Sequence, residues 1–214
     1  MGKSRVSTIA LFLLIAAAFI LWYLVFVFPG GNFWIKLSSA AAFLGLASLF
    51  FKDNTDKGRL YGTSGPVSWR DVLLGCASAV VLYFVFWLGK LVLSVIFPTS
   101  ETEIQSVYRQ GEAVSPVVIT ALLLLVTSPA EELFWRGFVQ KKLSDRTTPL
   151  WGLITGSILY AGVHIWTFNY TLILAALVAG LFWGYIYMRT GKLLPVIISH
   201  ALWTTAIFVL FPMG

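Results

Sequence analysis

Charged side chains are scarce in this sequence: they make up 11% of the 214 residues, whereas hydrophobic side chains make up 58%. Because water-soluble domains carry roughly 25% charged residues, a chain of this composition cannot cover a globule with polar groups. The composition excludes an ordinary soluble protein and indicates an integral membrane protein that crosses the bilayer several times. The net charge of +6 is explained by membrane orientation, so the lipid bilayer is an expected partner and nucleic acid is not.

Cysteine is almost absent as well, and the single Cys76 excludes an intrachain disulfide. Long linkers, internal repeats and low-complexity tracts are also missing, so we treat residues 1–214 as a single membrane domain.

The first apolar run, residues 8–28, exceeds the h-region of about 7–15 residues in a cleaved signal peptide. We interpret it as a retained span. Val6 stands where an N-myristoylation signal requires Ser or Thr, which excludes that lipid anchor.

Seven apolar stretches approach the length of about 20 residues that a membrane-crossing helix needs. These are residues 8–28, 33–51, 72–97, 117–139, 150–169, 171–188 and 193–211. The expected fold is therefore all-α, a polytopic transmembrane helical bundle of about seven spans. The short sequence "FNYT" at residues 168–171 predicts that the helices on either side of it are antiparallel neighbours.

The loops differ in their content of lysine and arginine, and this difference predicts the orientation of the chain. Most basic residues lie before the first span and in alternate loops, at residues 3–5, 52–70, 141–146 and 189–192. Cytoplasmic loops carry the excess of Lys and Arg. We therefore predict a cytoplasmic N-terminus and a C-terminus on the opposite side of the membrane.

Two pairs of glycines lie four residues apart in apolar stretches. Gly152 and Gly156 form one pair, and Gly180 and Gly184 form the other. Such pairs let two helix backbones approach closely, so we expect tight helix packing at both.

Residues 127–138, "TSPAEELFWRGF", place two adjacent glutamates in an apolar region. Pro129 predicts a kink or a restart of the helix, with Ser128 and Glu131 forming a capping box at the new start. Glu132 and Arg136 are four residues apart, the spacing of an ion pair on one helix face. An isolated charge in the membrane costs on the order of 2.5–3.5 kcal/mol on insertion scales, and pairing lowers that cost.

The chain has only two histidines, His164 and His200, and both lie in apolar spans. One buried histidine is more often a satisfied core residue than a catalyst. Two histidines together with an acidic pair favour another interpretation, because ionisable groups within a membrane usually face a cavity and one another. We predict that Glu131, His164 and His200 converge on one cavity, with Thr204 one turn beyond His200, and that the cavity opens toward the side of Lys141 and Lys142.

Three motifs in this region resemble those of one family. "EELFWR" at residues 131–136 matches an EExxxR motif, "YAGVH" at 160–164 has the aromatic-xxx-His form, and residues 184–205 resemble a last block with a further histidine. The chain thus resembles the CPBP family, the CAAX-protease and bacteriocin-processing proteins, also called Abi. The catalytic core that the resemblance implies lies within residues 117–211. The breadth of the family suggests a bacterial plasma membrane.

The resemblance implies an intramembrane CAAX-type endopeptidase that uses a water molecule to hydrolyse a peptide bond. Its substrate would be a hydrophobic or lipidated peptide or protein, and a prenylated CAAX protein is one candidate. Glu131 would be the general base, and His164 would position the water. His200 and Thr204 would bind the oxyanion. Glu132 and Arg136, the other two charged positions of the EExxxR motif, would support the site structurally.

Several alternatives stay open at this point. Zinc held by His164, His200 and Glu131, with the other glutamate as base, is one; the sequence has no HExxH helix, so a metal-free site is favoured. Thr204 stands where the family often has Asn or Asp, which favours a non-catalytic bacteriocin-immunity or scaffold protein that binds a peptide. A proton-coupled transporter is disfavoured, because no matching pair of broken helices marks repeated halves.

Three tryptophans near the motifs fit either an interfacial belt or a pocket: Trp135, Trp166 and Trp203.

Overall fold

The computed structural model describes residues 2–51, 68–111 and 114–213, and the side chains from Thr8 onward within these ranges. All regular elements in these ranges are helices, which confirms the predicted all-α class. The basic residues of the second loop, Lys52, Lys57 and Arg59, lie outside the described residues, so their part in the orientation stays a prediction.

The first half of the chain forms α1 (Gly2–Phe26), α2 (Phe33–Phe50), α3 (Trp69–Ile96), α4 (Ser100–Tyr108) and the 3₁₀ turn η2 (Arg109–Gly111). The second half begins with one continuous helix, Pro116–Arg146, and continues with α8 (Pro149–Gly162), the 3₁₀ turn η5 (Val163–Thr167), α9 (Tyr170–Thr190), α10 (Leu194–Thr205) and the π-helical turn η6 (Ala206–Leu210). Five helices are long and apolar enough to cross a membrane: Thr8–Phe26, Phe33–Phe50, Trp69–Ile96, Pro116–Arg146 and Tyr170–Thr190. The remaining two expected spans correspond to the shorter α8 with η5 and α10 with η6, so the count of seven is approximate.

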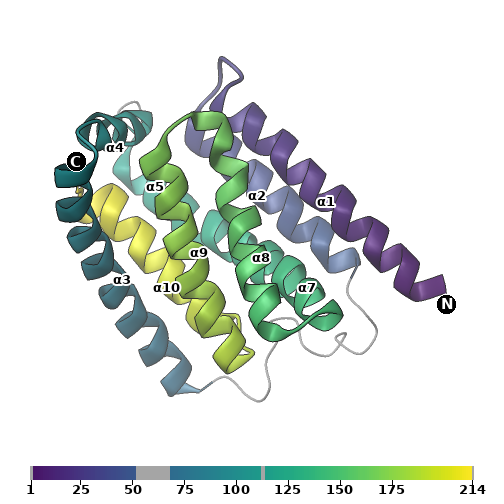
Figure 1. Ribbon diagram of the computed structural model, residues 1–214. Coiled ribbons are helices and arrows are strands. Elements are labelled where there is room, and N and C mark those ends of the chain that lie inside the picture. Colours follow the sequence, from purple (N-terminus) through teal and green to yellow (C-terminus); the bar gives the residue numbers. More distant parts are fainter. Residues whose placement is uncertain (1, 52–67, 112–113, 214) are drawn as a thin grey trace.

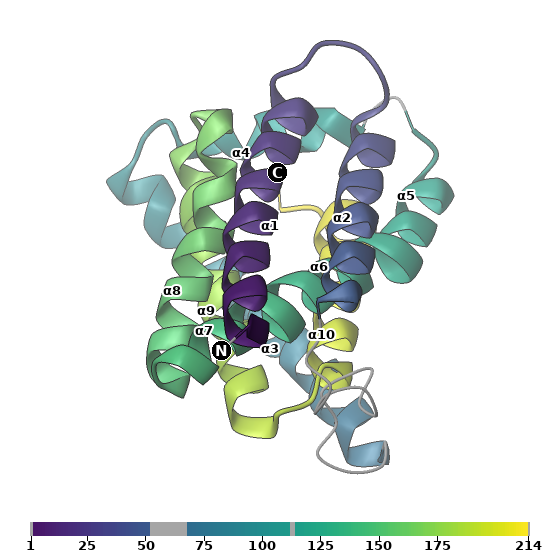
Figure 2. The same ribbon diagram turned by 90° about the vertical axis from the view of Figure 1, so that its right-hand side faces the viewer.

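The helices alternate in direction through the bundle (Figures 1 and 2). The start of α1, the start of α3 and the α9–α10 connection lie at one end, which we call the N-terminal end. The α1–α2 connection and α4 lie at the other, the α4 end, and the last described residues approach α4. Helices α8 and α9 run side by side in opposite directions, as the short turn between them predicts. Phe168 adopts the left-handed conformation (φ 50°) at this turn.

Of the kink or restart predicted at Pro129, the restart is wrong, because the helix passes through this residue. It consists of α5 (Pro116–Leu122), η3 (Leu123–Thr127), α6 (Ser128–Phe134), η4 (Trp135–Gln140) and α7 (Lys141–Arg146), of which η3 and η4 are π-helical. In the wide turn η3, the Ser128 N–H donates to the carbonyl of Leu123, five residues back. Proline can be accommodated in a helix where the local hydrogen bonds adjust in this way.

The capping box predicted at Ser128 is wrong for the same reason. Ser128 has helical angles (φ −63°, ψ −45°), and an N-cap residue needs non-helical ones. The Glu131 side chain is consequently free of a capping role, and its partner comes from another helix, as described below.

The glycine pairs pack helices closely, as predicted. A Cβ added to Gly184 of α9 would lie 2.5 Å from the Leu153 side chain of α8, and one added to Gly180 would lie 3.2 Å from the Tyr160 ring. On α8, a Cβ at Gly152 would lie 2.7 Å from the backbone nitrogen of Ser144. Because these glycines have no side chains, α9 and α7 can lie close to α8.

Candidate active site

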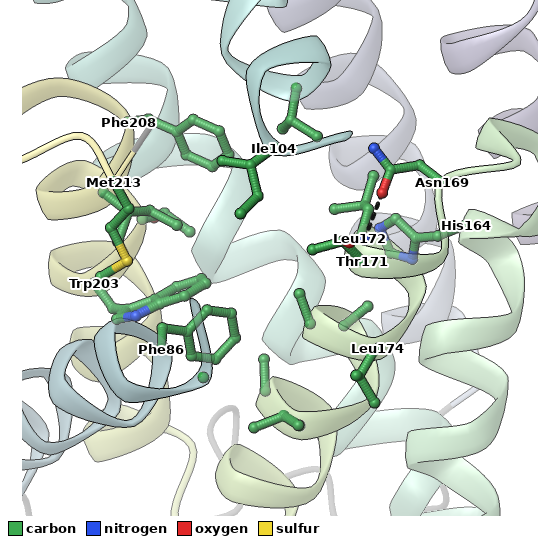
Figure 3. Close-up of a pocket in the computed structure, with 18 of the residues that line it drawn as sticks. Phe86, Ile104, His164, Asn169, Thr171, Leu172, Leu174, Trp203, Phe208 and Met213 are labelled. Carbon is green, nitrogen blue, oxygen red and sulfur yellow. Dashed lines mark hydrogen bonds between the residues drawn. The ribbon is translucent and has the colours of Figure 1, made fainter. Parts of the chain in front are cut away.

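A cavity of about 560 Å³ brings the four predicted residues together from three elements. Glu131 of α6, His164 of η5, and His200 and Thr204 of α10 all line it. Most of the other lining side chains are apolar. Figure 3 shows Phe86, Trp203 and Met213 on one side of the cavity and His164 with Asn169 on the other.

Glu131 is 6% exposed, and its carboxylate is bound by a residue that sequence reasoning did not assign to the site. The hydroxyl of Tyr160 donates to Glu131 Oε2 at 3.1 Å. Tyr160 lies in α8 and also lines the cavity. It is the aromatic residue of the aromatic-xxx-His motif, and its hydroxyl was the available signal, because a buried tyrosine usually directs its hydroxyl to a partner.

Glu132 is fully buried and is the centre of a charged cluster. Its Oε1 accepts from Arg136 Nη1 at 3.0 Å and lies 2.7 Å from His200 Nδ1. The predicted pairing of Glu132 with Arg136 is thus present, and His200 is an additional partner. Because a carboxylate only accepts hydrogen bonds, the contact requires a proton on His200 Nδ1.

Arg136, 2% exposed, connects this cluster to α8 and α9. Its Nη2 donates to the carbonyl of Gly180 at 3.3 Å, which the close approach at that glycine allows. Its guanidinium carbon lies 4.7 Å from the centre of the Tyr160 ring and 5.5 Å from that of Trp183. Aromatic faces of this kind stabilise a cation where water is excluded, so both aromatic residues help to hold the buried charge.

His200 is held rigidly on α10. Its ring stacks on Trp183 with ring centres 3.9 Å apart and an angle of 20° between the planes. Trp183 is itself anchored by a hydrogen bond from its Nε1 to Ser199 Oγ at 3.2 Å. With Nδ1 held by Glu132, the nitrogen left for a ligand in the cavity is Nε2.

Both ring nitrogens of His164 already have partners. Its Nδ1 lies 3.0 Å from the carbonyl oxygen of Tyr160, and Trp22 Nε1 donates to its Nε2 at 3.4 Å. The second distance is beyond the usual range of an N–H donor bond, so this bond is weak. A water molecule bound to Nε2 would have to share that nitrogen with Trp22.

Thr204 lines the cavity as expected, but its hydroxyl group bonds to its own helix. The hydroxyl donates to the carbonyl of His200 at 2.8 Å, with Ser128 Oγ 3.4 Å away. Threonine inside a helix commonly bonds to the carbonyl four residues back. The hydroxyl hydrogen that an oxyanion would need is therefore engaged in this arrangement.

Among the described residues, no group of three or more His, Cys, Asp or Glu side chains could hold a metal ion. The zinc ligands considered from sequence, His164, His200 and Glu131, share the cavity but are not gathered as a ligand set. Each histidine presents its Nδ1 to a protein oxygen, an arrangement that metal-bound histidines also adopt. No step below depends on a metal.

The lining also bears on two further points from the sequence, the tryptophans near the motifs and the lysines at 141 and 142. Of the three tryptophans near the motifs, Trp203 lines the cavity, whereas Trp135 is buried in the core and Trp166 donates to the carbonyl of Phe19. The lysines at 141 and 142 do not line it either. The lining extends instead to α4 and to Met213, away from the N-terminal end.

The comparisons with known proteins agree with the motifs. Residues 113–206 match the family described as type II CAAX prenyl endopeptidase Rce1-like, whereas no curated protein and no solved structure matches the chain. The matched segment contains Glu131, Glu132, Arg136, Tyr160, His164, Trp183, His200 and Thr204. Residues 113–206 are thus similar to the Rce1-like type II CAAX prenyl endopeptidases, in agreement with the resemblance of the motifs to the CPBP proteins.

Proposed function

We propose that this protein is an intramembrane endopeptidase that uses Glu131 to activate water and cuts a lipidated, CAAX-type peptide. The observation that carries the proposal is the meeting of an oriented carboxylate and an oriented imidazole on one mostly apolar cavity. Peptide hydrolysis needs a base for water, a donor for the oxyanion and a proton for the leaving amine. The cluster contains a group for each of these tasks.

In the first step, Glu131 accepts a proton from a water molecule, and the water oxygen forms a bond to the carbonyl carbon of the substrate. Tyr160 acts as a positioning residue, because its hydrogen bond to Oε2 leaves Oε1 to receive the proton. His164 contributes a weakly engaged Nε2 at the cavity wall, where it would accept the other hydrogen of the water.

The second task is to stabilise the negative charge that forms on the carbonyl oxygen. His200 Nε2 would donate to this oxyanion while the imidazole carries protons on both nitrogens. Glu132 stabilises the doubly protonated ring through Nδ1, and Arg136 holds Glu132 in place. In the last step, Glu131 returns its proton to the amine nitrogen, the carbon–nitrogen bond breaks, and a carboxylic acid and an amine are released.

The charges of the buried cluster are consistent with proton transfer by Glu131 and oxyanion binding by His200. Glu131 and Glu132 together carry two negative charges when ionised, and Arg136 supplies one positive charge. One further proton, bound by His200 or Glu131, makes the buried cluster neutral. The reaction moves such a proton between groups without leaving a net charge in the apolar interior.

The cavity suits a substrate with a lipid chain. Exposed apolar side chains of α3 border it, including Val85, Leu88 and Val92, and Leu174 of α9 is exposed on the other side. Surfaces of this kind face lipid in a membrane protein. A prenyl group could therefore enter from the bilayer between α3 and α9 while the peptide reaches Glu131.

One observation favours a second candidate function, a non-catalytic protein that binds a peptide. The Thr204 hydroxyl donates within its own helix, so the site has one oxyanion donor fewer than an amide at this position would provide. An immunity or scaffold protein could keep the cavity without turning substrate over.

The experiment that separates the two functions is cleavage of a quenched, farnesylated peptide by the purified protein in detergent. We expect cleavage by the native protein and its loss in Glu131→Gln, with the folded yield unchanged because glutamine still accepts from Tyr160. Binding of the peptide without cleavage by the native protein would support the non-catalytic function. Turnover by Glu131→Gln close to the native rate would show that Glu131 is not the base.

A further inference from the structure

Lys90 of α3 is the single lysine or arginine among the described residues that line the cavity. Its Nζ donates to the backbone carbonyl of Met213, at the α4 end. Glu131 is the single carboxylate that lines the same cavity in the described part of the chain. A long apolar space thus has an acid and histidines in one region and an ammonium group in another.

The separation of these two regions can be followed along α3 and α10. The two helices run in the same direction, and Phe86 lies beside Trp203, with ring centres 4.5 Å apart. Lys90 is four residues beyond Phe86, and His200 is three residues before Trp203. At 1.5 Å per residue, Lys90 lies about 10 Å further along the helix axes than His200.

A peptide segment already occupies the Lys90 region. Tyr83 donates to the carbonyl of Phe211 at 3.4 Å, and the backbone N–H of Met213 donates to the hydroxyl of Tyr108 at 3.0 Å. Lys90 completes the set by binding the Met213 carbonyl. The three side chains therefore bind peptide backbone, here that of the chain itself.

We propose that Lys90 binds the free C-terminal carboxylate of the peptide substrate, in place of the Met213 carbonyl. This inference rests on the proposed endopeptidase function and adds a length requirement to it. An extended tripeptide covers about 10 Å at 3.3 Å per residue, so a carboxylate on Lys90 places the bond three residues from the peptide's end beside His200. A CAAX sequence has three residues after its modified cysteine.

A carboxylate is the stronger ligand for Lys90. Hydrogen bonds between two charged partners are about twice as strong as neutral ones, and the Met213 carbonyl is neutral. The exchange would move residues 212–213 away from Lys90 and open the α4 end of the cavity.

The test compares two farnesylated peptides that differ only at the C-terminus, one with a free carboxylate and one with a carboxamide. Binding is measured by fluorescence anisotropy in the Glu131→Gln background, and KM and kcat are measured in the active protein. We expect the acid to bind about ten- to hundredfold more tightly than the amide. Lys90→Met should remove this difference, and Lys90→Arg should retain most of it.

Lys36→Met is the matched control, since Lys36 also donates to backbone carbonyls, those of Leu24 and Phe28, but lies outside this cavity. It should keep the acid preference. Because the acid-to-amide ratio is internal to each sample, partial misfolding of a variant does not change it. Equal binding of acid and amide, or no binding of either, would overturn the role of Lys90. Cleavage without an acid preference would do so while leaving the endopeptidase function intact.

Discussion

Tyr160 contacts three parts of the site at once. Its hydroxyl donates to Glu131, its ring lies below the guanidinium of Arg136, and its backbone carbonyl binds His164 Nδ1. Tyr160→Phe removes the first contact alone. Losing one hydrogen bond to a charged group costs about 1.5–3 kcal/mol, so we expect kcat to fall about ten- to hundredfold with little change in KM. Steady-state kinetics and a thermal unfolding curve check this, and a kcat within twofold of the native value would contradict it.

Arg136 is expected to matter first for stability. Arg136→Met leaves Glu132 buried without its guanidinium partner, and breaking a buried pair in this way costs about 3–5 kcal/mol. The melting temperature and the yield of monodisperse protein should both fall. The double variant Glu132→Gln with Arg136→Met removes the unpaired charge and should recover part of the loss. If the single variant melts like the native protein, the buried ion pair contributes little to stability.

Thr204 offers a gain-of-function test that also separates a protease from a binding protein. Thr204→Asn introduces an amide donor on the cavity wall, and one oxyanion donor is worth up to about 10²–10³ in kcat. We expect turnover to rise by at least about tenfold. Thr204→Val is the control and should leave kcat nearly unchanged, because the hydroxyl hydrogen is already bound to the His200 carbonyl. A fall in turnover of Thr204→Val would show instead that the hydroxyl takes part in catalysis.

At the scale of elements, the glycines of α9 set how close this helix lies to the site. The carbonyls of Gly180 and Gly184 accept from Arg136 at 3.3 Å and from Gln140 at 2.9 Å. Both bonds join α9 to the long helix Pro116–Arg146, which carries the glutamates. A wider separation of the helices would therefore weaken the support of the charged cluster as well as the packing.

Gly184→Ala tests this packing. The new Cβ would lie 2.5 Å from Leu153 Cδ1 and 2.9 Å from Gln140 Oε1, and such overpacking costs about 1–3 kcal/mol. We expect a lower melting temperature and reduced activity. Gly89→Ala on α3 is the comparison, because its Cβ would meet nothing within 4 Å and the change should stabilise the helix by roughly 0.5–1 kcal/mol. Equal melting temperatures for the two variants would argue against close packing at Gly184.

At the scale of the molecule, the two ends of the described chain lie at opposite ends of the bundle. The distribution of Lys and Arg among the loops predicts that the N-terminus is cytoplasmic. In a Cys76→Ala background, single cysteines at positions 2 and 214 should be labelled from opposite sides of the membrane by an impermeant reagent. Labelling of both from one side would refute this topology. The experiment also decides which side the α4 end of the cavity faces.

The sequence by itself determined the class of the protein, the positions of its helices and the local ion pair. Apolar length predicts helices in a bilayer because the backbone must satisfy its own hydrogen bonds there, and the spacing of Glu132 and Arg136 brings them together on any helix. The glycine pairs likewise allow close packing of α8 with its neighbours α7 and α9, to which short turns connect it. These features depend on residues close together in the chain.

The tertiary structure decided the contacts between distant residues and the competition between local ones. The bonds from Tyr160 to Glu131 and from His200 to Glu132 join residues 29 and 68 positions apart, and no local pattern specifies them. At Ser128 a π-helical turn replaced the capping box that the local sequence favoured, because the long helix continues through Pro129. At Thr204 the helix carbonyl took the hydroxyl hydrogen that the cavity could have used. At Glu131 and Glu132 the partners come from packing of distant helices, whereas at Thr204 the local helix carbonyl prevailed.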